Sequence, residues 1–208
     1  MKEYDVYLLD FDGTTFDTSE SLFPVFLHGF EAIGKKCTPE DAREYMHHSL
    51  PQAAKMANLS EEELAPWAEE ICRALDYEDS LSLIKIFPET FEVVSKLHSR
   101  GKKLGIVTGN LSDHVRKILG RFGLDSAFPV IVGSDVYKKS KPDREPIDIA
   151  LRMLGVDGAS AVYVGDSLQD IECGHNAGID AILVDRNDEH PDFGGEKIKS
   201  LRQLFSCD

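Results

Sequence analysis

Five short apolar runs, alternating in the later part of the chain with amphipathic segments, constrain the fold more than any other feature. The runs are VYLL (6–9), LGIV (104–107), PVIV (129–132), AVYV (161–164) and AILV (181–184). Each has the length of a buried strand. Strands that alternate with helices form right-handed βαβ units and so a parallel sheet. The sequence therefore predicts an α/β fold, with a Rossmann-like parallel sheet and helices on both faces.

The segments between the later runs carry the start and stop signals of helices. A glycine ends each of the segments 88–101, 111–123 and 167–178. The remaining segment has Pro146 in its first turn and Gly155 just past its end. Glycine past the last turn and proline in the first turn are typical of helix ends. We expect helices within 88–101, 111–123, 145–155 and 167–178.

Residues from about 16 to 84 contain no convincing strand and interrupt this alternation. Helical patterns cover 19–34, 38–49 and 60–80, and Ser60 followed by Glu63 is a capping-box signature. We therefore predict a core domain formed by residues 1–15 and 85–208, with a helical cap domain, residues 16–84, inserted after the first strand. Because the insertion leaves from the carboxyl edge of the sheet, it can cover that edge.

Charge and composition restrict the partners. The 208 residues carry a formal charge of −14, which disfavours nucleic acids and anionic membranes. No apolar run is long enough to span a bilayer. The four cysteines form no CxxC pair, as is typical of free intracellular thiols. We expect a cytoplasmic, monomeric protein.

The stretch DFDGT places two carboxylates directly after the first apolar run. On an extended segment Asp10 and Asp12 point to the same side, and Gly13 allows a tight turn close to a ligand. A single aspartate here would most simply be a turn or capping residue. A pair of repelling acids instead favours a hard cation such as Mg²⁺, which prefers oxygen ligands.

A second acidic stretch, GDSLQD, follows the run at 161–164. Asp166 comes at the strand exit, and Asp170 lies one helical turn further along. Asp166 alone would be read as a helix cap. As a third acid at a strand end, it is a candidate metal ligand.

Groups suited to an anion follow two other strands. Thr108, Gly109 and Asn110 lie at a strand-to-helix turn, where a hydroxyl and backbone N–H groups can cradle phosphate. Lys141, before Pro142, can neutralise an anion or a carboxylate. Acids for a metal, donors for an anion and a lysine together indicate phosphoryl transfer, which depends on positioning and charge stabilisation.

Four motifs in order resemble the haloacid dehalogenase (HAD) superfamily, in its phosphatase branch with a C1-type helical cap, as in phosphoglycolate phosphatase-like and β-phosphoglucomutase-like proteins. The motifs are DFDGT (10–14), VTGN (107–110), KP (141–142) and GDSLQD (165–170), and the resemblance covers nearly the whole chain. It implies Mg²⁺-dependent hydrolysis of a small phosphorylated metabolite through an aspartyl-phosphate.

The resemblance also implies a role for each motif. Asp10 would be the nucleophile and Asp12 the general acid and base. Mg²⁺ would be bound by the Asp10 side chain, the Asp12 backbone carbonyl and Asp166. Asp170 would orient Lys141 or a metal-bound water. Phosphate would be held by Gly13, Thr108, Gly109, Asn110 and Lys141.

Alternatives within and outside this superfamily remain. Asp12 argues against the dehalogenase and phosphonate-hydrolase branches, which lack that acid, and Leu22 stands where the mutase branch has a histidine. A phosphomutase, a pyrophosphatase and a phosphonate hydrolase stay open as alternatives. A binding protein that lost activity would typically lack one of the acids. The substrate depends on the cap, whose polar candidates are His28, Arg43, His47, His48 and Lys55; Phe23, Phe26 and Phe30 are expected in the cap core.

Overall fold

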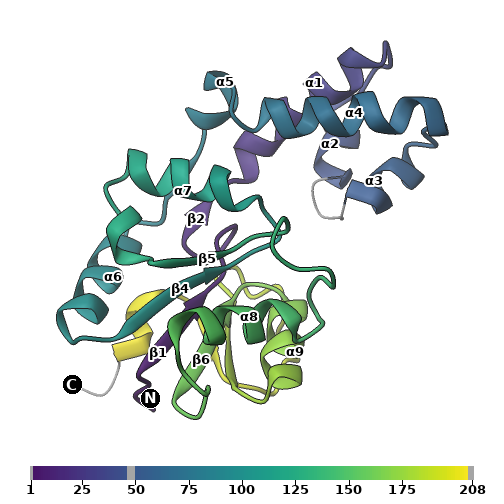
Figure 1. Ribbon diagram of the computed structural model, residues 1–208. Coiled ribbons are helices and arrows are strands. Elements are labelled where there is room, and N and C mark those ends of the chain that lie inside the picture. Colours follow the sequence, from purple (N-terminus) through teal and green to yellow (C-terminus); the bar gives the residue numbers. More distant parts are fainter. Residues whose placement is uncertain (1, 46–49, 206–208) are drawn as a thin grey trace. The chain divides into compact units, whose positions relative to one another are not determined.

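The computed structural model describes residues 2–45 and 50–205 of the chain, which divides into two compact units (Figure 1). The first comprises residues 1–16 and 86–208, and the second residues 17–85. We take these units as the core and cap domains, and that assignment remains a proposal. Each unit is described separately below.

The first unit is built on a parallel six-stranded sheet in the order β5-β4-β1-β6-β7-β8. The five apolar runs each form one of its strands, which confirms the predicted fold class. The sixth strand was not predicted, because two residues are too few to show a periodicity. The strands are β1 (Val6–Leu9), β4 (Lys103–Val107), β5 (Val130–Val132), β6 (Ala161–Gly165), β7 (Asp180–Val184) and β8 (Lys197–Ile198).

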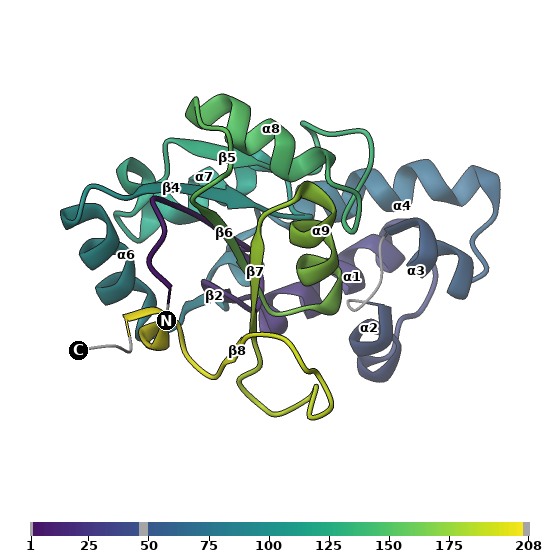
Figure 2. The same cartoon turned by 90° about the horizontal axis from the view of Figure 1, so that it is seen from below.

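Four helices match the segments predicted between the strands, and they cover both faces of the sheet. α6 and α7 lie on one face, and α8 and α9 on the other (Figures 1 and 2). Beneath α8 and α9 a buried cluster includes Leu8, Ile147 and Tyr163. The bounds are α6 (Thr90–Ser99), α7 (Ser112–Arg121), α8 (Glu145–Leu154) and α9 (Leu168–Ala177).

Strand register brings the ends of β1, β4 and β6 to one point of the carboxyl edge. Leu9 is paired with Ile106 on one side and with Val164 on the other. After β1 the chain first adds β4 and β5 on one side of β1, and it then adds β6, β7 and β8 on the other side. The direction in which strands are added to the sheet therefore reverses at β1. Ligands of open α/β sheets bind at such switch points.

The second unit is helical. Its core contains the predicted Phe26 and Phe30, both packed with Trp67, and Phe23 lies partly buried against them. Ser60 N–H donates to Glu63 Oε2 at 2.8 Å, which confirms the capping-box interaction. The helices are α1 (Ser19–Ala32), α2 (Pro39–Tyr45), α3 (Leu50–Met56), α4 (Glu61–Ala74) and α5 (Glu78–Leu81).

The structure corrects two expectations for this region. Helix α3 was not predicted; its Pro51 occupies the first turn, where a missing N–H removes no helical hydrogen bond. Residues 16–84 were expected to contain no strand, yet β2 (Phe16–Asp17) pairs with β3 (Lys85–Ile86) where the chain leaves and re-enters the first unit. A strand of two residues is too short to show an alternation of apolar and polar residues, so the sequence could not predict β2 or β3.

An apolar pocket of about 440 Å³ lies within the helical unit, between α3 and α4. Among the described residues that line this pocket, Lys55 is the one charged residue. The pocket therefore lacks the acids expected of the phosphoryl site. No helix in the described part of the chain is long and apolar enough to cross a membrane.

Candidate active site

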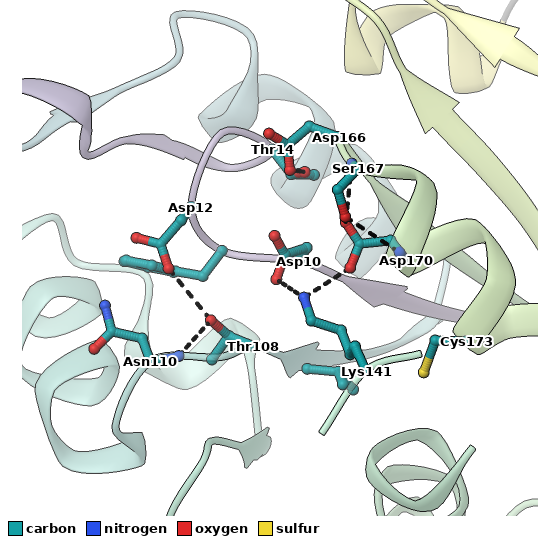
Figure 3. Close-up of polar contacts among 12 residues, drawn as sticks. Asp10, Asp12, Thr14, Thr108, Asn110, Lys141, Asp166, Ser167, Asp170 and Cys173 are labelled. Atoms are coloured by element: carbon teal, nitrogen blue, oxygen red, sulfur yellow. Dashed lines mark hydrogen bonds and ion pairs between the residues drawn. The ribbon is translucent and has the colours of Figure 1, made fainter. Parts of the chain in front are cut away.

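Lys141 lies at the centre of a buried charge cluster at the carboxyl edge of the sheet (Figure 3). Its Nζ is 3.0 Å from Asp10 Oδ1 and 2.7 Å from Asp170 Oδ1. Burial alone would lower the pKa of Lys141, but the two carboxylates outweigh burial and raise it well above its ordinary value. Lys141 is therefore a fixed positive charge that bridges two of the four motifs.

Asp10 is the first residue after β1 and is held by its backbone. Its N–H donates to Val164 O at 2.8 Å, and its carbonyl accepts a hydrogen bond from Thr15 Oγ1. Burial, together with the nearby carboxylates, raises the pKa of Asp10 in spite of Lys141. A cation or a bound positive group at this point would favour its ionised form.

The turn after Asp10 packs directly against Asp166. Gly13 has a φ of +74°, and a Cβ placed there would lie 2.0 Å from Asp166 Oδ2. Thr14 Oγ1 donates to Asp166 Oδ1 at 3.3 Å. Burial, followed by the charge of Asp170, raises the pKa of Asp166 to about 6. Glycine is thus required at position 13 both by conformation and by the approach of a carboxylate.

Asp170 belongs to a capping box at the start of α9. Its Oδ2 accepts hydrogen bonds from the N–H and hydroxyl of Ser167, at 3.0 and 2.6 Å, and Ser167 Oγ accepts from the Asp170 N–H. Burial would raise the pKa of Asp170, but Lys141 and Ser167 lower it. The helix cap is therefore Ser167, which leaves Asp166 available for another role.

The acidic cluster fits a hard cation. Carboxylate oxygens of Asp10, Asp166 and Asp170 lie within 4.8 Å of one another. Both oxygens of Asp170 already accept hydrogen bonds, from Lys141 and from Ser167. Asp10 and Asp166 are therefore the carboxylates best suited to bind Mg²⁺ directly, whereas Asp170 is suited to hold Lys141.

The Asp12 side chain lies beside the charge cluster and contacts the turn after β4. Its Oδ2 accepts from Thr108 Oγ1 at 3.4 Å, and its carboxylate is not among those that surround Lys141 (Figure 3). Strand β1 ends at Leu9, and beyond it Gly13 N–H donates to Phe16 O at 2.8 Å. Asp10 and Asp12 are therefore near each other but have different partners, Lys141 for Asp10 and Thr108 for Asp12.

The turn after β4 is closed by a hydrogen bond within it. Thr108 is buried, and its Oγ1 accepts from the Asn110 N–H at 3.1 Å. No described atom lies within 4 Å of a Cβ built on Gly109, so that side of the turn is open. The Thr108 hydroxyl and the Gly109 backbone are the parts of this loop best placed for a phosphoryl group.

Sequence reasoning missed two polar residues that contact the site. Tyr163, within β6, was read as a core residue, and an aromatic hydroxyl in an otherwise aliphatic run was the available signal. Arg186 follows β7, forms a buried ion pair with Glu89 and donates from Nη2 to Thr14 O at 2.9 Å. Nothing in the sequence distinguishes Arg186 from a surface arginine.

A known protein family matches most of the chain. The sequence model of the family described as haloacid dehalogenase-like hydrolase matches residues 7–184. The chain is a haloacid dehalogenase-like hydrolase. It is 34% identical to a protein named pyrophosphatase PpaX from Halalkalibacterium halodurans over 185 residues, 88% of this chain and 84% of the relative. It is 28% identical to a phosphoglycolate phosphatase from Aquifex aeolicus, with 96% of each chain covered.

Solved structures show the same fold. A haloacid dehalogenase-like hydrolase from Bacteroides fragilis superposes with a TM-score of 0.84 at 23% identity, over 97% of this chain and all of the other. CbbY from Rhodobacter sphaeroides, solved in complex with phosphate, gives a TM-score of 0.81 at 22% identity and covers 97% and 96% of the two chains. The haloacid dehalogenase-like fold thus extends over both units.

Proposed function

We propose that this haloacid dehalogenase-like phosphatase hydrolyses small phosphate esters or anhydrides with Mg²⁺, through a phosphorylated Asp10. The observation that carries the proposal is the contact of Lys141 Nζ with Asp10 Oδ1, next to Asp166. Asp10 Oδ2 accepts no hydrogen bond from the residues that the structure describes, so it is the oxygen available to attack phosphorus.

Two displacements at phosphorus complete the reaction. Asp10 Oδ2 forms a bond to phosphorus as the bond to the leaving oxygen breaks, and protonated Asp12 gives that oxygen its proton. Water then attacks the aspartyl-phosphate and loses a proton to Asp12, which releases phosphate and restores both acids. The Thr108 hydroxyl, 3.4 Å from Asp12 Oδ2, is suited to hold the general acid beside the phosphoryl group.

The remaining site residues would hold Mg²⁺ and the phosphoryl oxygens or offset the charge of Asp10. Asp10, Asp166 and the Asp12 backbone carbonyl would hold Mg²⁺, which offsets the negative charge of the phosphoryl oxygens when it is bound. Gly13, Thr108, Gly109 and Asn110 would surround those oxygens. Lys141 offsets the negative charge of Asp10, the proposed nucleophile, in the buried site.

Pyrophosphate is the first substrate to test, because several relatives at 30–34% identity are named pyrophosphatase PpaX. Phosphoglycolate is the second, from the relative of that name. Both are small anions, as the proposal requires. We further propose that the protein acts as a cytoplasmic monomer.

Phosphate release from pyrophosphate, phosphoglycolate, sugar phosphates and nucleoside monophosphates tests the proposal. We expect turnover with Mg²⁺, loss with EDTA, and poor replacement by Ca²⁺, which tolerates looser coordination. Crystals grown with beryllium fluoride should show trifluoroberyllate, a mimic of the phosphoryl group, joined through its beryllium to an Asp10 carboxylate oxygen. Turnover that persists in EDTA, or trifluoroberyllate joined to another residue, would overturn the assignment.

A further inference from the structure

A single hydroxyl connects three of the four motifs. Tyr163 OH lies 2.8 Å from Val107 O, 3.0 Å from Asp170 Oδ1 and 3.3 Å from Lys141 Nζ. Tyr163 itself is fully buried in β6, beneath α8 and α9. Val107 directly precedes Thr108, so the hydroxyl also contacts the strand end that leads into the proposed phosphate loop.

The protons of this group can be assigned from the contacts. The Lys141 ammonium has three N–H groups and three acceptors, namely Asp10 Oδ1, Asp170 Oδ1 and the Tyr163 oxygen. Because the Tyr163 oxygen accepts from Lys141, its own proton is directed to Val107 O or Asp170 Oδ1. Every N–H of the ammonium is thereby given a fixed direction.

We propose that Tyr163 is a positioning residue that fixes the Lys141 ammonium against Asp10, a role that rests on the function proposed above. Without the hydroxyl, one N–H of a buried ammonium loses its acceptor, and Lys141 can rotate away from Asp10. A buried hydrogen bond to a charged group is strong enough that its loss is measurable in turnover.

Tyr163→Phe removes the hydroxyl and keeps the ring. We expect kcat to fall about 10- to 100-fold and KM to change by less than about threefold, because the group acts on the nucleophile and not on the substrate. Tyr7→Phe is the matched control: Tyr7 is a buried tyrosine of β1 whose hydroxyl accepts from the Tyr4 N–H, away from the motifs. It should retain wild-type kcat.

A double-mutant cycle separates positioning from a loss of stability. Tyr163 and Asp170 both contact Lys141, so the losses caused by Tyr163→Phe and Asp170→Asn should be less than additive. Losses that add fully, or a Tyr163→Phe defect equal to that of Tyr7→Phe, would overturn the proposal.

A readout that does not need turnover is the Lys141 ammonium resonance in ¹⁵N–¹H spectra, identified by its absence in Lys141→Met. We expect slow hydrogen exchange in the wild type and in Tyr7→Phe, and exchange at least about tenfold faster in Tyr163→Phe. An unchanged exchange rate in Tyr163→Phe would overturn the positioning role. If the wild type cleaves no phosphate compound, the proposed function fails, whereas this exchange measurement still decides what Tyr163 does.

Discussion

At the scale of single residues, the site holds more negative than positive charge. Lys141 contacts Asp10 and Asp170, while Asp166 and Asp12 are near enough to raise the pKa of Asp10. Carboxylates this close repel one another, and burial increases the cost. The site is therefore poised for a cation, and its acids differ in role because their partners differ: Asp10 faces Lys141, and Asp12 faces Thr108.

The two acids of DFDGT should fail in different ways when substituted. Asp10→Asn should abolish both turnover and the covalent intermediate. Asp12→Asn should slow turnover about 100- to 10,000-fold, the usual cost of losing general acid–base catalysis. Rapid-quench experiments with ³²P-labelled substrate should detect phosphoenzyme in Asp12→Asn and none in Asp10→Asn. Phosphoenzyme in Asp10→Asn would rule out Asp10 as the nucleophile.

Gly13 offers a test of the close approach to Asp166. In Gly13→Ala the new Cβ would meet Asp166 Oδ2, so Asp166 must move and Mg²⁺ activation should weaken by at least about tenfold. Gly101→Ala is the control, because Gly101 has nearly the same φ, +70°, and open space around its Cβ position. Both variants carry backbone strain, so equal Mg²⁺ requirements would show that the contact with Asp166 is unimportant.

At the scale of elements, Arg186 fastens the turn after β1 to the ends of neighbouring elements. It donates to Thr14 O, pairs with Glu89 and stacks on Phe87, with 3.7 Å between its Cζ and the ring centroid. Thr90 Oγ1 holds the next carbonyl, Thr15 O, at 2.9 Å. Arg186 and Thr90 thereby hold two successive carbonyl groups of the loop that follows Asp10.

The Arg186–Glu89 pair should stabilise the fold in a pH-dependent way. Burial would raise the pKa of Glu89, but Arg186 outweighs it and lowers the pKa below the ordinary value. The ion pair therefore stabilises the fold fully at pH values above the ordinary pKa of glutamate, and this stabilisation is lost as the pH falls through the lowered pKa of Glu89. Glu89→Gln should cost about 3 kcal/mol of unfolding free energy at pH 7, and less in acid.

Glu92→Gln provides the comparison in the same helix region. Glu92 forms an exposed pair with Arg202, at 2.8 Å, and such pairs contribute about 0–1 kcal/mol. Denaturant unfolding at pH 7 and at acidic pH should separate the two variants. Equal losses at pH 7 would mean that the Arg186–Glu89 pair contributes no more than a surface contact.

At the scale of the whole molecule, chemistry and selection are proposed to belong to different units. The four motifs all lie in the first unit, while residues 17–85 contribute none of them. Two crossings, at β2 and β3, join the units, and we propose that these paired linkers act as a hinge. The polar candidates of the helical unit include the exposed Arg43 and Lys55; His47 and His48 lie outside the described residues.

Substitutions in the helical unit should change the choice of substrate more than the chemistry. For Arg43→Ala and Lys55→Ala we expect the ratio of kcat/KM for the best natural substrate to kcat/KM for p-nitrophenyl phosphate to shift by at least about threefold. Arg152→Ala, an exposed change in the last turn of α8 of the first unit, is the control. If the ratio moves in neither cap variant, these two residues do not select the substrate.

The sequence by itself determined the α/β class, the five main strands, the helices between them and the acids at the strand ends. These follow from periodicity and from residues next to one another in the chain, which local physics controls. Only the tertiary structure decided that Asp12 faces Thr108, that Tyr163 contacts Lys141, and that Arg186 holds Thr14. The partners in these contacts are 96, 22 and 172 residues apart. Such pairs meet only after the sheet has assembled, because strand order and register, which no single segment encodes, place their side chains.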